Sequence, residues 1–291
     1  MTNTPNAYYL PEPSHWPLVG SVALFCLFAG AGVLLNGHGA GSIIMGLGFA
    51  LFVFMLFGWF GSVIGESESG RYNEQVDVSF RWAMAWFILS EVMFFAAFFG
   101  ALFYARTFAV PWLGGEGAGD ITNQYLWPDF EAVWPLLQLP DATNFTPARE
   151  AMGPLFIPAI NTAILLSSGA TVTWAHWGLK KNNRRQLIVG LALTVTLGFL
   201  FLGLQAYEYG HAYTEMDLKL SSGIYGTTFF MLTGFHGAHV TIGAIMLTVI
   251  LARSIKGHFT PTQHFAFEGV AWYWHFVDVV WICLFIIVYT L

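Results

Sequence analysis

Seven long apolar runs alternate with shorter polar segments along the chain. They cover residues 16–36, 42–65, 82–107, 155–179, 187–210, 224–252 and 270–290. A helix needs about 20 mostly apolar residues to cross a bilayer, and each run is long enough. Because lipid offers the backbone no hydrogen-bond partners, each run must be helical. The pattern therefore predicts an all-α membrane protein with seven transmembrane helices in a single membrane domain, residues 1–291.

The basic residues predict how these helices are oriented. Residues 1–16 hold no lysine or arginine, unlike a signal peptide, so we expect the first helix to be retained. With the N-terminus inside, the inner loops collect most of the basic residues: Arg71, Arg81, Lys180, Lys181, Arg184, Arg185, Arg253 and Lys256. Only Arg106, Arg149 and Lys219 fall outside. Because basic residues concentrate in cytoplasmic loops, the N-terminus is predicted inside and the C-terminus outside.

The composition agrees with a lipid-facing surface. The chain is 56% hydrophobic and 10% charged, whereas soluble domains carry about 25% charged residues. The net charge of −6 argues against a nucleic-acid partner, which would require clustered basic residues. Cys26 and Cys283 lie in separate apolar runs, so neither a disulfide nor a thiolate metal site is expected.

One long polar segment, residues 108–153, joins the third and fourth runs. It is rich in glycine, proline and tryptophan and carries six acidic residues against a single arginine. On the predicted topology it lies outside. Two interpretations stay open: a solvated acidic cap, or a docking surface for a neighbouring subunit or a basic partner.

Several ionisable side chains lie inside the apolar runs, where each costs about 2.5–3.5 kcal/mol on insertion scales. Glu91 stands in the third run without a basic neighbour in sequence, which indicates a protonated carboxyl or a partner on another helix. Further ionisable residues occur in pairs spaced by three, which places both members on one helix face. These pairs are Glu208 with His211, His236 with His239, and His275 with Asp278.

Three interpretations compete for these groups. Facing histidines could hold a metal or haem, or the carboxylates and histidines could form a proton or ion pathway. The third interpretation is hydrogen bonding between helices together with binding of lipid head groups. The pattern favours the third, because no dense ligand motif, phosphate loop or nucleophile motif occurs. We therefore expect no metal site and no catalytic residue in this chain.

Six blocks of sequence point to a known family. They are PSHWPLVGS at 13–21, ILSEVMFFAAFF at 88–99, INTAILLSSGATVTWAHW at 160–177, LQAYEY at 204–209, IYGTTFFMLTGFHGAHV at 224–240 and HFAFEGVAWYWHFVDVVW at 264–281. In this order, and on seven matching spans, they make the chain closely similar to subunit III of the haem–copper cytochrome c oxidases.

The resemblance implies a two-helix pair and a five-helix bundle around a V-shaped cleft that holds phospholipids. It implies direct contact with oxidase subunit I in a complex with subunit II and other subunits, where haem a and copper reside. It implies an accessory role in a proton-translocating aa3-type oxidase that takes electrons from cytochrome c. In that role the chain stabilises the catalytic subunit and supports proton uptake, without a redox centre of its own.

The resemblance also assigns residues. Glu91 matches the family's membrane carboxylate on helix three, which reacts with carbodiimides. The positions that match residues lining the lipid cleft are Trp59, Glu66, His236, His239 and Arg253, and Arg253 is expected to meet a lipid phosphate. His275 and Asp278 stay an intramembrane polar pair without an assigned role.

Two departures matter. Gly65 stands where mitochondrial members have a basic residue, which puts one lipid contact in doubt. The outer loop is longer than in mitochondrial members, which indicates a bacterial source and therefore a bacterial inner membrane. With the orientation predicted from the basic residues, the N-terminus is cytoplasmic and the C-terminus periplasmic. The alternatives are a quinol-oxidase subunit, a stand-alone seven-helix transporter or receptor, and a haem-binding membrane anchor.

Overall fold

The computed structural model describes residues 9–141 and 145–290, and all regular structure among them is helical. Seven of these described helices have 20 residues or more: α1 (Trp16–Leu35), α2 (Ala40–Glu68), α3 (Glu74–Tyr104), α6 (Ile157–Lys180), α7 (Arg184–Thr214), α8 (Gly223–Lys256) and α9 (Phe265–Leu284). A π-helical turn, Ala105–Ala109, continues α3 into the short helix α4 (Val110–Leu113), and a second π-helical turn, Phe285–Thr290, continues α9. The molecule is thus a multi-pass helical membrane protein by length and composition.

Six of the seven long helices are apolar enough to cross a membrane, and α6 is the exception. At 24 residues α6 is long enough to span, but hydroxyl and amide residues dilute its apolar character. Several of them face the protein interior: Asn161 and Ser168 are completely buried, and the Thr171 hydroxyl lies 2.8 Å from that of Thr194 on α7. Part of the polarity of α6 therefore faces the protein interior, and the seventh span remains a prediction.

The observed helices are longer than the apolar runs that predicted them. α3 begins at Glu74 rather than 82, and α7 ends at Thr214 rather than 210. The predicted start of the outer loop, residue 108, was wrong, because continuous helix extends from α3 through α4 to Leu113. A further helix, α5 (Asp120–Leu126), follows within the predicted loop. Residues 142–144 of that loop lie outside the described residues. Hydropathy locates the part of a helix that fits lipid, whereas polar end turns continue the helix into water.

The chain divides into two compact units, residues 1–80 and 81–291. In the first unit, α1 and α2 pack on each other through glycines. A Cβ added at Gly30 would lie 2.5 Å from the backbone nitrogen of Met45, and one at Gly48 would lie 2.7 Å from that of Leu27. Side chains larger than hydrogen do not fit there, so the two backbones approach closely.

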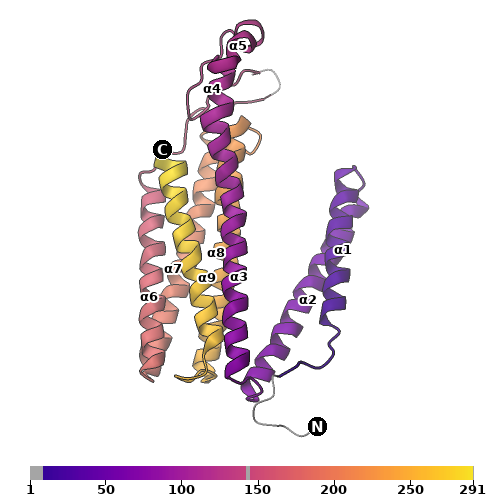
Figure 1. The fold of residues 1–291 in the computed structure, drawn as a ribbon, viewed down its shortest axis with the longest axis vertical. Coiled ribbons are helices and arrows are strands. Elements are labelled where there is room, and N and C mark those ends of the chain that lie inside the picture. The colour runs from indigo at the N-terminus through magenta and orange to yellow at the C-terminus, as the bar shows by residue number, and fades with distance from the viewer. Residues whose placement is uncertain (1–8, 142–144, 291) are drawn as a thin grey trace. The chain divides into compact units, whose positions relative to one another are not determined.

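In the second unit, α7 packs against α6 and α8, and α9 packs against α6 and α8, so the four lie side by side in Figure 1. Residues of α3 from Arg81 onward join this bundle. Large aromatic side chains fill its core; Trp274, Trp281 and Phe201 are fully buried. This interlocking of side chains positions the ionisable groups of the bundle, among them Glu208 and Asp278.

Candidate functional site

Glu91 on α3 meets His239 on α8. The Glu91 Oε2 atom lies 2.9 Å from His239 Nε2, and the other ring nitrogen, Nδ1, lies 2.6 Å from the backbone oxygen of Phe235. A carbonyl oxygen only accepts, so Nδ1 carries a proton and donates it. His239 Nε2 and the Glu91 oxygen then need one further proton between them to form a hydrogen bond, carried either by the carboxyl group or by Nε2. The sequence left a protonated and a paired Glu91 open, and the geometry places a pairing partner on α8.

An aromatic cage surrounds this pair. The His239 ring packs on Phe95 at a centroid distance of 5.0 Å and stacks on Tyr273 at 6.3 Å, and Phe94 and Phe276 complete the cage. Both polar side chains are mostly buried, at 22% exposed for Glu91 and 13% for His239. Such surroundings disfavour separated charges, so the pair suits the storage of one proton or the fastening of α3 to α8.

His236 occupies a different environment from His239. It is completely buried, its Nε2 donates to the backbone oxygen of Val277 at 3.1 Å, and its ring contacts Phe201 and Trp281. His236 was expected to line a lipid site, and within this chain its side chain lies in the protein core. Residues three apart differ by about 60° around a helix, enough to turn one histidine into the core and the other towards α3.

The remaining predicted lipid ligands lie in both units. In the second unit, the Arg253 guanidinium lies 4.6 Å from the ring centre of Phe259 and is largely buried. In the first unit, Trp59 is 41% exposed, and Glu66 accepts a 2.8 Å hydrogen bond from the hydroxyl of Tyr72. Burial, followed by the hydrogen bond to Glu66, raises the pKa of Tyr72, so its hydroxyl stays protonated and keeps donating.

The predicted pair His275 and Asp278 is joined as the spacing indicated. His275 Nδ1 lies 3.4 Å from Asp278 Oδ2, and Nε2 lies 3.2 Å from the Thr173 hydroxyl on α6. The pair lines an open groove of about 540 Å³ between α6 and α9. A Cβ at Gly169 would collide with Asp278, so glycine is required for this close approach.

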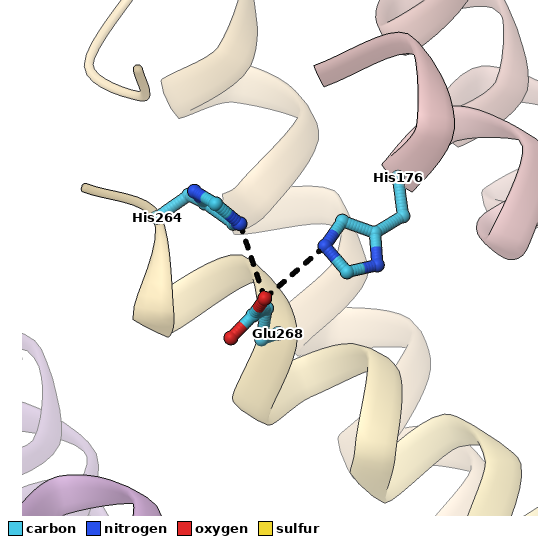
Figure 2. A group of neighbouring side chains, drawn as sticks. All are labelled: His176, His264 and Glu268. Atoms are coloured by element: carbon cyan, nitrogen blue, oxygen red, sulfur yellow. Dashed lines mark hydrogen bonds and ion pairs between the residues drawn. The ribbon is translucent and has the colours of Figure 1, made fainter. Parts of the chain in front are cut away.

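Glu208 and a cluster of two histidines and one glutamate were not assigned a specific role from the sequence. Glu208 is 1% exposed and accepts a 2.6 Å hydrogen bond from the Tyr289 hydroxyl at the end of the chain. The cluster joins His176 on α6 to His264 and Glu268 on α9, and Figure 2 shows both imidazoles directed at the same carboxylate oxygen. The four-residue spacing of His264 and Glu268 places them one turn apart and could have indicated this cluster.

Known proteins of one family match this chain along nearly its whole length. The family model described as "Cytochrome c oxidase subunit III" matches residues 6–118 and 127–291. The unmatched residues 119–126 fall in the predicted outer loop. "Cytochrome c oxidase subunit 3" of Carassius auratus is 39% identical over 290 residues, covering 99% of this chain and 98% of its own length. The proteins of the same name from Gadus morhua, at 40%, and Homo sapiens, at 39%, show the same coverage.

Proposed function

The chain belongs to the cytochrome c oxidase subunit III family, and from this premise we propose that it is an accessory subunit of an aerobic respiratory oxidase. The family is not itself a carrier of redox centres, so oxygen reduction takes place in other subunits. The observation that carries the proposal is the family match across both units of the chain.

We propose that the chain contacts oxidase subunit I directly, in a complex with subunit II that holds haem a and copper and pumps protons. The exposed apolar side chains of α1 and α2 support such contacts, because these helices present many large hydrophobic groups outward. Lipid or another membrane subunit would have to cover them. In this role the chain stabilises the catalytic subunit and supports its proton uptake.

The geometry suggests a specific part for Glu91 and His239. With one shared proton the pair carries no net charge, whether that proton is on the Glu91 carboxyl group or on His239 Nε2. We infer that it fastens α3 to α8 and keeps the bundle in the form that the neighbouring subunit binds. Its high degree of burial supports this positioning role.

We also propose that the chain binds structural phospholipids through Trp59 and Glu66 in its first unit and through His239 and Arg253 in its second. A guanidinium binds a phosphate through several hydrogen bonds. Replacing Arg253 with alanine should therefore lower the number of phospholipids per purified chain, as counted by mass spectrometry. Lys256→Ala, at an exposed position one turn along α8, is the matched control. Equal lipid counts in all three proteins would remove Arg253 from the lipid site.

For the membrane, we propose seven spans in a bacterial inner membrane, with the N-terminus cytoplasmic and the C-terminus periplasmic. The basic turn between α6 and α7 supports this orientation: Lys180, Lys181, Arg184 and Arg185 surround it. Asn183 begins α7 by accepting a 3.2 Å hydrogen bond from the Gln186 amide, which keeps the turn short. Short basic loops are the strongest determinants of orientation.

Purification of the tagged chain in mild detergent tests the proposed function. Haem a absorption bands and co-purifying large subunits are the expected result. A colourless chain that purifies alone would contradict the proposal. In that case the intramembrane carboxylates and histidines would need another explanation, such as transport.

A further inference from the structure

Three side chains direct ligand atoms at a common point near one end of α6 and α9. His264 is the N-cap of α9, Glu268 lies in the first turn of that helix, and His176 lies near the end of α6 (Figure 2). His264 Nε2 is 3.1 Å and His176 Nε2 is 3.3 Å from the same oxygen, Glu268 Oε1. All three ligand atoms lie within 4.8 Å of one another.

These separations fit ligands of one metal ion. Zinc binds histidine nitrogen at about 2.0–2.1 Å and carboxylate oxygen at about 2.0–2.2 Å. Two such bonds at 90–109° hold their ligand atoms about 2.9–3.4 Å apart. Both observed nitrogen–oxygen separations, 3.1 and 3.3 Å, fall in that interval. Sequence-distant α6 and α9 thus supply a ligand set in which both nitrogen–oxygen separations fit one cation, while the two imidazole nitrogens lie within 4.8 Å of each other.

The hydrogen bonds of His264 fix which ring nitrogen faces the point. Its Nδ1 lies 3.0 Å from the backbone oxygen of Thr260, a pure acceptor, so Nδ1 carries the proton. In the neutral ring Nε2 then presents a lone pair to a carboxylate oxygen, and two acceptors repel each other. A metal cation or an additional proton between them makes the contact favourable. His176 Nε2 is buried, and its contact with Glu268 Oε1 at 3.3 Å does not have the geometry of a hydrogen bond.

The other oxygen of Glu268 is held separately. Arg81 on α3 forms an ion pair with Oε2 and therefore turns Oε1 towards the two imidazoles. A carbonyl behind one histidine and a guanidinium behind the carboxylate are outer contacts of the kind that orient metal ligands. The arginine charge also opposes a cation, which should keep affinity below that of a closed four-ligand zinc site.

We propose that His176, His264 and Glu268 form a binding site for one divalent zinc ion, with water completing its coordination. Two imidazoles and one carboxylate suit zinc, whereas calcium and magnesium take oxygen ligands. His176 is 20% exposed, which leaves a route for the ion. The site revises the expectation of no metal in this chain, and it does not depend on the proposed oxidase role.

The test uses the full-length chain purified in detergent and stripped with a chelator. Zinc affinity is measured by competition with a chromophoric chelator, and Co²⁺ is added separately to read its visible d–d bands. We expect one zinc per chain, and at least a tenfold weaker affinity in His176→Ala and in His264→Ala, with loss of the Co²⁺ bands. His38→Ala removes an exposed histidine from the α1–α2 turn and should bind zinc as the unmodified chain does.

His176→Gln gives a second route if an alanine variant misfolds, because the amide fills the same space and ligates zinc poorly. Unchanged zinc affinity in a folded His176→Gln variant would overturn the proposal. So would ¹⁵N NMR that finds both His264 nitrogens still protonated in the presence of saturating zinc, because a proton would then occupy the contact.

Discussion

The two units of this chain hold their helices together in different ways. α1 and α2 bury only small residues and one methionine: Gly20, Ala23, Gly30, Gly41, Gly48 and Met55. α9 alone buries twelve residues, including Tyr273, Trp274 and Trp281. The first unit therefore gains stability from close backbone contact, and the second from interlocked large side chains.

The difference also decides where polar groups can reside. Helices in backbone contact leave little room for side chains between them, so ionisable residues have no place in that interface. The second unit spaces its helices with aromatic rings, and polar groups such as Asn161, Glu208 and Asp278 are buried among them. The buried polar and ionisable side chains are accordingly found in the second unit.

The largest predicted effect comes from removing a ring of the second unit. Trp274 is fully buried, fits against Gly198 and Gly243, and donates a 2.8 Å hydrogen bond to the Ser168 hydroxyl. Trp274→Ala should lower the free energy of unfolding by about 3–5 kcal/mol, as for other large aromatic truncations. Denaturant unfolding of the chain in detergent measures it. Trp177→Ala, at a residue 57% exposed, should stay within about 0.5 kcal/mol. Similar losses in both variants would contradict the interlocked core.

A single added methyl group in the first unit should weaken the contact between α1 and α2. At Gly30 a Cβ meets the backbone of Met45, whereas at Gly32, half a turn away, it meets nothing within 4 Å. Gly30→Ala should destabilise the α1–α2 contact by about 1–3 kcal/mol through overpacking. Amide exchange of α1 and α2 peptides, followed by mass spectrometry, should then accelerate about 5- to 150-fold. Gly32→Ala is the control, and equal exchange in the two variants would refute the backbone-contact model.

Two substitutions of Glu91 test whether charge or hydrogen bonding joins α3 to α8 through the Glu91–His239 pair. Glu91→Gln can donate to His239 Nε2 and should change stability by less than about 1 kcal/mol. Glu91→Leu leaves that nitrogen buried without a partner and should cost about 1–3 kcal/mol. Unfolding of both variants in detergent gives the comparison. A loss for Glu91→Gln as large as for Glu91→Leu would show that the pair is ionised.

Sequence reasoning located the long helices because the cost of exposing backbone to lipid leaves few alternatives. It found Glu91 and the pair of His275 and Asp278 because ionisable residues are rare in apolar runs. It could not give His239 as the partner of Glu91, since 148 positions separate them and only the packing of α3 on α8 joins them. The expectation of a lipid contact for His236 came from the family resemblance, whereas spacing alone gives a helix face but not what covers that face; in the structure His236 is completely buried.

The cluster of His176, His264 and Glu268 was missed for a related reason. Its residues lie at the ends of apolar runs, where polar side chains are ordinary, and one of the three comes from another helix. Hydropathy therefore carries no signal there. Only the three-dimensional structure brings the two imidazoles to one carboxylate oxygen.

The smallest predicted effect concerns the side-chain hydrogen bond from Trp16 Nε1 to the Ser62 hydroxyl, which joins α1 to α2 over 3.2 Å. This hydrogen bond is exposed. Ser62→Ala should therefore lower the stability of the α1–α2 contact by only about 0.5 kcal/mol, as measured by amide exchange of α1. Ser21→Ala is the control, because that hydroxyl bonds within its own helix, to the Pro17 carbonyl. If glycine contacts hold the pair, Gly30→Ala must exceed Ser62→Ala severalfold in the same assay. If Ser62→Ala proves the more damaging change, polar side chains hold both units and the contrast between them fails.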